Sequence, residues 1–172
     1  MIGDLLTREW PGDQRVSGRF LMSNPFPTLV CCLLYFAGVR AGVAFMRRRE
    51  ALQLRWSLVL YNCLLVLLSL WIFIDGGRFG WFGHYSLSCA ECDQSDSETN
   101  RRMINIVYVY YISKFIEMMD TMFFVVRKRN DLLTRLHLIH HGILPLSCWF
   151  TVKYVPGSSF PARLFESLTN AS

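Results

Sequence analysis

The sequence predicts an all-α protein that crosses a membrane as a polytopic helical bundle, and three observations carry this prediction. Of the 172 residues, 52% are hydrophobic and only 18% are charged, whereas about 25% are charged in an average soluble protein. The apolar residues form blocks of roughly 18–23 residues, which is the length of a membrane span. Basic residues cluster at the ends of these blocks, where they set the orientation of spans and meet anionic head groups.

Four such blocks follow one another along the chain. We expect spans at approximately residues 28–46, 57–74, 104–126 and 137–155. Asn24, Pro25 and Pro27 form a turn before the first span. Pro145 is tolerated inside the fourth span, because neighbouring groups can satisfy the freed carbonyl. The segment before residue 25 is polar, without a basic start followed by an apolar stretch, so we expect no cleaved signal peptide.

The distribution of basic residues predicts one orientation. The turns at 47–55 and 127–135 are rich in arginine and lysine, so they should lie in the cytosol. The N-terminus and an acidic loop at 75–103 then lie on the opposite side. The net charge of +5 is explained by these turns, and we expect no nucleic-acid binding.

Two cysteines of the acidic loop leave several interpretations open. Cys89 and Cys92 form a C-x-x-C pair, which occurs in redox pairs, in half of a zinc site and in disulfides. A disulfide is plausible if the loop lies in an oxidising compartment.

Ionisable side chains interrupt the third span. Lys114, Glu117, Asp120 and Thr121 fall within an arc of about 120° on a helix. Each charge at the centre of a span costs roughly 2.5–3.5 kcal/mol if it is unpaired. The charges must therefore pair or face a polar cavity. Lys114 and Glu117 stand at i and i+3 and can neutralise each other, and such a pair could also serve only to fix helix packing.

Three of the four histidines in the chain open the fourth span. His137, His140 and His141 stand at i, i+3 and i+4 and cover an arc of about 100°. His140 and Asp120 lie at the same depth, roughly 8–9 Å below the cytosolic face. Because the connecting turn is short, we expect carboxylate, hydroxyl and imidazoles to share one pocket that opens toward the cytosol.

Three uses of this pocket remain open from the residues alone. Three imidazoles can hold a zinc ion. Imidazoles beside carboxylates can also perform acid–base and nucleophilic chemistry on a thioester. The third use is packing without chemistry.

These residues resemble two motifs of the very-long-chain fatty acid elongases. The stretch KFIEMMDTMFF, residues 114–124, is similar to the K-x-x-E-x-x-D-T motif, and HLIHH, residues 137–141, is similar to the H-x-x-H-H box. The resemblance continues through RKRN and ILPLSCWFTVKYVPG and covers roughly residues 20–157. It implies an enzyme of the endoplasmic reticulum membrane with seven helical spans. Such an enzyme condenses an acyl-CoA with malonyl-CoA to give a 3-oxoacyl-CoA, CO₂ and CoA, without a metal or a bound cofactor.

The resemblance also implies roles for individual residues. His140 would accept the acyl group, and His137 and His141 would stabilise an oxyanion or handle protons. The remaining polar residues of the third span would support them: Glu117 and Asp120 orient and charge the imidazoles, Lys114 supplies the counter-charge, and Thr121 adds a hydroxyl. Arg127, Lys128 and Arg129 would meet the phosphates of CoA, although their role in topology would also explain them.

After Gly157 the sequence departs from the elongase pattern. Elongases continue with three more spans, whereas residues 158–172 form a divergent polar tail. We therefore expect residues 1–157 to be the N-terminal part of an elongase membrane domain, with about four of seven spans. One hypothesis is a partial condensing enzyme. The alternative is a non-catalytic membrane protein that pairs with a full-length elongase, as a homo- or hetero-oligomer, through small-residue helix faces.

Overall fold

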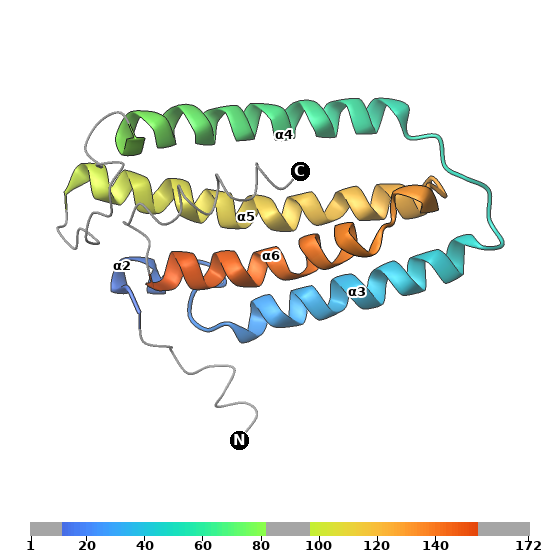
Figure 1. Ribbon diagram of the computed structural model, residues 1–172, viewed down its shortest axis with the longest axis horizontal. Helices are drawn as coiled ribbons and strands as arrows, with labels where there is room; N and C mark the ends of the chain where they lie inside the picture. Colours follow the sequence, from blue (N-terminus) through green and yellow to red (C-terminus); the bar gives the residue numbers. More distant parts are fainter. Residues whose placement is uncertain (1–11, 82–96, 155–172) are drawn as a thin grey trace, which may run out of the picture.

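Four long helices lie side by side in the computed structural model, which describes residues 12–81 and 97–154 (Figure 1). They are α3 (Phe26–Met46), α4 (Arg55–Gly76), α5 (Glu98–Val126) and α6 (Arg135–Tyr154). The shorter elements are α2 (Gln14–Ser17), a π-helical turn η1 (Gly77–Trp81) and a 3₁₀ turn η2 (Asn130–Leu132). No strand occurs in these two ranges, and the predicted all-α fold is confirmed. Cys89, Cys92 and the polar tail at 158–172 lie outside the described residues.

Two stretches are long and apolar enough to cross a membrane, judged by length and composition. They are Phe26–Met46 and Arg55–Phe79, so the prediction of an all-α membrane protein is confirmed at this level. Helix α5 is longer still, but it carries Lys114, Glu117 and Asp120 in its second half. The count of four spans therefore stays a prediction.

The segment expected to be a loop at 75–103 is shorter than predicted. Helix α4 continues to Gly76 and is followed by η1, while α5 already begins at Glu98. The Ser97 side chain accepts a hydrogen bond from the Asn100 amide at 3.2 Å, and Glu98 places a negative charge in the first turn. Both features stabilise a helix N-terminus, and they were the signals available in the sequence for this earlier start.

Helix α5 is central, with α6 and α3 on one side and α4 on the other (Figure 1). Two groups of buried side chains join α3, α5 and α6. One lies between α3 and the second half of α5, and it contains Cys32, Tyr35, Val39, Met46, Met118 and Val125. In contrast, Ile72 is the only buried side chain of α4, so the described residues leave most of α4 uncovered.

The second group lies where residues 12–25, which we call the N-terminal segment, fold across the first half of α5 and the second half of α6. Val16 and Met22 from this segment pack with Tyr111 and Trp149, and all four are fully buried. The Trp149 indole N–H donates to the Leu21 carbonyl at 2.8 Å. We refer to this region, with Lys153, as the closed end.

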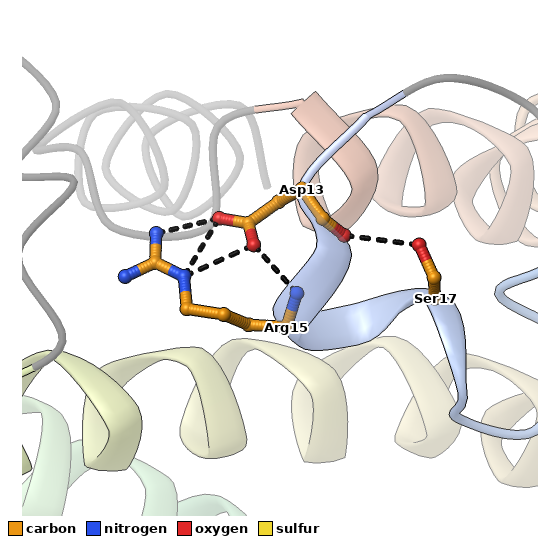
Figure 2. A network of polar contacts seen from close by, with 3 residues as sticks. All are labelled: Asp13, Arg15 and Ser17. Carbon is orange, nitrogen blue, oxygen red and sulfur yellow. Dashed lines mark hydrogen bonds and ion pairs between the residues drawn. The ribbon is translucent and has the colours of Figure 1, made fainter.

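Lys153 attaches helix α2 to the C-terminal end of α6. Its ammonium donates to the Ser17 hydroxyl at 2.9 Å, and its carbonyl accepts from the Asp13 amide at 2.9 Å. Figure 2 shows how α2 is held together: Asp13 caps the Arg15 amide at 2.8 Å and binds the Arg15 guanidinium, while the Ser17 hydroxyl donates to the Asp13 carbonyl. This four-residue helix was not predicted.

Candidate functional site

The Lys114–Glu117 pair forms as predicted. The Lys114 ammonium lies 2.7 Å and 3.0 Å from the two carboxylate oxygens of Glu117. It also lies 4.2 Å from the centre of the Tyr110 ring, and the two charged side chains are only 11% and 22% exposed. The pair therefore enters an apolar bundle with its net charge neutralised, which lowers the cost of burial.

Thr121 joins three helices. Its side chain is fully buried, and its hydroxyl lies 3.0 Å from His137 Nε2 on α6 and 2.8 Å from the Tyr35 hydroxyl on α3. We expected α5 to bring this hydroxyl level with His140 and His141, and the structure places it instead against His137, about one turn nearer the start of α6.

The three histidines are close together at the start of α6. The ring centres of His137 and His141 are 4.4 Å apart, and those of His140 and His141 are 5.4 Å apart. His137 and His141 are half-buried and His140 is exposed. The Thr134 hydroxyl accepts from the His137 amide at 3.1 Å, so the helix cap fixes where the cluster begins. We refer to Thr121 and these histidines as the histidine end.

Asp120 lies elsewhere than expected. Its carboxyl group is an electrostatic neighbour of the Tyr61 hydroxyl of α4, which donates to the Ile116 carbonyl at 3.0 Å, and none of the described contacts joins it to a histidine. Successive residues of a helix are about 100° apart, so when Thr121 faces α6, Asp120 turns toward α4. The expectation of one pocket holding all the polar groups is therefore corrected: the hydroxyl reaches an imidazole, and this carboxylate does not.

Lys114 connects the ion pair electrostatically to α6. It acts on His141 and on the buried thiol of Cys148, which stand on one face of α6 because seven residues are nearly two helical turns. Glu117 is held by Lys114 and by a longer contact of 3.4 Å from the Ser113 hydroxyl. Among the described side chains of α5, Thr121 is the one that hydrogen-bonds with a histidine ring.

The basic turn after α5 offers two exposed cations. Lys128 and Arg129 are exposed and Arg127 is half-buried. Arg129 forms an ion pair of 3.0 Å with Asp131, and its guanidinium holds the pKa of that carboxyl below the ordinary value. A phosphate bound at this turn would compete with Asp131 for Arg129, so contact with CoA stays a prediction.

Residues 12–81 and 97–154 contain no group of three or more His, Cys, Asp or Glu side chains arranged to hold a metal ion. The hypothesis of a three-histidine metal site gains no support from the geometry of these ranges.

Sequence reasoning did not single out Tyr35 and Tyr61. Both lie in apolar helices and both place their hydroxyl at a polar group of α5. A buried tyrosine usually finds a hydrogen-bond partner, so their presence in apolar blocks was a signal that partners exist. It could not say which partners.

Comparison with known proteins agrees with the motifs. The family model described as ELO: GNS1/SUR4 family matches residues 20–168. The chain is 44% identical over 157 residues to a very long chain fatty acid elongase of Aedes aegypti, and this alignment covers 90% of the chain and 41% of the relative. It is 41% identical to very long chain fatty acid elongase 7 of Drosophila melanogaster, covering 90% of the chain and 44% of the relative. It is also 41% identical to very long chain fatty acid elongase 5 of Bos taurus, covering 87% and 50%.

The chain spans about half the length of these relatives or less, and the stretch that it shares includes both motifs around Lys114 and His137. The matched range, the identity and the resemblance of the motifs lead to the same conclusion. This chain belongs to the ELO: GNS1/SUR4 family.

Proposed function

We propose that this chain is the histidine-bearing part of an enzyme that condenses an acyl-CoA with malonyl-CoA to give a 3-oxoacyl-CoA, CO₂ and CoA. Its relatives are named very long chain fatty acid elongases. The observation that supports the proposal best is the contact of Thr121 with His137, beside clustered histidine rings and a neutralised Lys114–Glu117 pair. Polar groups at this depth of an apolar bundle indicate function.

His140 is the candidate nucleophile. Its ring is exposed beside His141, so a thioester can approach it. In the proposed first step the imidazole attacks the acyl carbonyl, the carbon–sulfur bond breaks, and the CoA thiolate takes the imidazole proton. Malonyl-CoA then loses CO₂, and the electron pair left on its α-carbon attacks the acyl-imidazole. The 3-oxoacyl-CoA departs, and one proton from solvent restores the neutral imidazole.

The other polar groups would support this reaction from fixed positions. His137 and His141 lie close enough to act on the oxyanion or its protons. Lys114, held by Glu117, would supply the counter-charge that the resemblance implies. Arg127, Lys128 and Arg129 would receive the CoA phosphates at the cytosolic side of an endoplasmic reticulum membrane that the chain crosses several times. The proposed reaction needs no metal and no bound cofactor.

A complementation experiment tests the proposal. A full-length relative is disabled by replacing all the histidines of its own histidine box, and it is co-expressed with this chain in microsomes. Long-chain acyl-CoA and malonyl-CoA labelled with ¹⁴C in the free carboxyl group are supplied, and release of ¹⁴CO₂ is measured. We expect release with this chain, and none with its His140→Ala variant.

The control is Leu60→Ala on α4, 63% exposed, which removes an exposed apolar side chain away from the histidines and should leave release unchanged. Absence of ¹⁴CO₂ when this chain is inserted in the membrane and bound to the relative would overturn the proposal. So would equal release with His140→Ala.

An exposed face of α6 favours a second candidate function. Leu136, Ile139, Ile143 and Phe150 are between 43% and 76% exposed, and their spacing puts them on one side of the helix. This side could bind another elongase without adding catalysis. Co-purification with the full-length relative in detergent, without ¹⁴CO₂ release, would favour this non-catalytic function.

A further inference from the structure

We propose that Tyr35 is a positioning residue that acts through Thr121 to hold His137 in the Nδ1–H tautomer. The Tyr35 hydroxyl lies 2.8 Å from Thr121 Oγ1, which lies 3.0 Å from His137 Nε2. Tyr35 is 5% exposed and Thr121 is fully buried. The three residues come from α3, α5 and α6, so the relay is made by tertiary packing. Its importance for catalysis rests on the proposed function, while its geometry does not.

The number of hydrogens fixes the direction of the relay. Each hydroxyl has one hydrogen to donate. If Tyr35 donates to Thr121 and Thr121 donates to His137, both hydrogens are used and Nε2 acts as the acceptor. In the opposite direction Thr121 donates to Tyr35, and the Tyr35 hydrogen then needs another acceptor. The described residues provide none for it, and a buried donor without a partner is unfavourable. If Tyr35 and His137 both donated to Thr121, the Thr121 hydrogen would be the one without a described acceptor.

This direction determines what His137 can do. With Nε2 accepting from Thr121, the hydrogen of the neutral ring sits on Nδ1. The nitrogen that remains for a ligand is therefore a donor. His137 can give a hydrogen bond to an oxyanion, and it cannot take a proton on Nε2 while the relay stands. The relay thus selects oxyanion stabilisation over general-base chemistry for this residue.

A second hydroxyl pair between the same two helices has no histidine. Thr28 Oγ1 on α3 lies 2.6 Å from the Tyr111 hydroxyl on α5, and both residues are fully buried. The two pairs have the same chemistry and comparable burial, so each contributes similarly to holding α3 on α5. Removal of the Thr28–Tyr111 pair is therefore a matched control that separates packing of the helices from control of the imidazole.

The tautomer can be measured in the whole chain without any enzymatic activity. The chain has four histidines, so ¹⁵N-histidine labelling in lipid nanodiscs gives four ring systems, and the signals lost in His137→Gln identify His137. An unprotonated ring nitrogen and a protonated one resonate in well-separated ranges. At a pH where the rings are neutral, we expect His137 Nε2 in the unprotonated range and Nδ1 in the protonated range.

Four variants decide the proposal. Thr121→Val should shift the His137 Nε2 signal toward the protonated range, and Tyr35→Phe should shift it partly in the same direction. Thr121→Ser should keep the wild-type spectrum. Thr28→Val should leave the His137 signals unchanged. Circular dichroism and size-exclusion profiles identify variants that do not fold, and Thr121→Ser, which keeps the hydroxyl, provides the decisive comparison with Tyr35→Phe if Thr121→Val is lost.

Three results would overturn the proposal: a wild-type His137 with its hydrogen on Nε2, a Tyr35→Phe spectrum identical to wild type, or a shift in Thr28→Val as large as that in Tyr35→Phe. Because the signal is independent of condensation, the relay can fail while the proposed function stands, and the reverse also holds.

Discussion

The closed end and the histidine end are built from the same two helices in opposite ways. At the closed end Trp149 and Lys153 are fully buried, and the N-terminal segment supplies partners for both. At the histidine end His140 is exposed, and Ile139 and Ile143 beside it are 53% and 51% exposed. One end of the α5–α6 pair is covered by the chain itself, and the other leaves the His140 imidazole exposed.

This difference shows how stability and chemistry are separated along one helix. A buried ammonium is tolerated only when it is hydrogen-bonded, and Lys153 meets this condition through Ser17. Under the proposed function the imidazoles must stay open, because a substrate has to reach them. We therefore expect substitutions at the closed end to change stability most, and substitutions at the histidine end to change chemistry most.

The largest expected effect is that of Trp149→Ala. The change removes a fully buried indole and its hydrogen bond to Leu21, and large-to-small changes of this kind cost about 3–5 kcal/mol. The free energy of unfolding of the chain in bicelles, measured by titration with SDS, should fall by this amount. Leu136→Ala on the exposed side of the same helix should change it by less than about 0.5 kcal/mol. Equal effects of the two changes would show that the closed end does not stabilise the bundle.

A smaller effect is expected where α3 crosses α6 near the histidines. A Cβ atom at Gly142 would overlap Cζ of the Phe36 ring, so Gly142→Ala forces this ring to move. The overpacking destabilises the fold by about 1–3 kcal/mol. The higher helix propensity of alanine offsets about 0.5–1 kcal/mol of this loss. We expect a net loss of about 1–2 kcal/mol in the same titration.

Two comparisons check the cause of this loss. Phe36→Leu should restore stability when it is combined with Gly142→Ala, which a double-mutant cycle would report as coupling. Gly38→Ala on α3 should be tolerated, since its Cβ would meet Met122 at an ordinary 3.6 Å. Coupling near zero would mean that the crossing is less tightly packed than the structure indicates. Because the Phe36 ring packs edge-on against Tyr35, Gly142→Ala should also disturb the His137 signals.

Hydropathy and helical spacing predicted much of the histidine end. The long helices follow from apolar blocks of span length, and the Lys114–Glu117 pair follows from i,i+3 spacing. The depth argument placed Thr121 level with His140 and His141, whereas its hydroxyl meets His137, about one turn nearer the start of α6. Spacing gives the angle between two residues of one helix, but it does not give the rotation of that helix against its neighbours. Asp120 illustrates this limit, since a rotation of about 100° decides whether it faces α6 or α4.

The closed end could not be predicted in the same way. Helix α2 has four residues, which is too short for any periodic pattern. Its position depends on Lys153, which is far away in sequence, and on backbone groups such as the Leu21 carbonyl. Such contacts carry no signal in the residue types of the N-terminal segment, apart from Asp13 as a good N-cap residue.

The smallest expected effect is a pH dependence of the closed end. Hydrogen bonds from the Arg15 side chain, joined by the Arg15 backbone amide and the charge of Lys153, hold the pKa of Asp13 below its ordinary value. The folded pKa is thus lower than the unfolded one, so the stabilisation is fully present above the unfolded pKa of about 4 and is lost as the pH falls through the folded pKa. The Trp149 indole N–H, which binds the segment that begins with Asp13, should report this loss by NMR as a transition below about pH 4.

Asp13→Asn should abolish the transition, whereas Asp131→Asn should not, because Asp131 is paired with Arg129 in the exposed turn after α5. A transition that persists in Asp13→Asn would assign the acid sensitivity to another group and would leave α2 held by Lys153 and Ser17 alone.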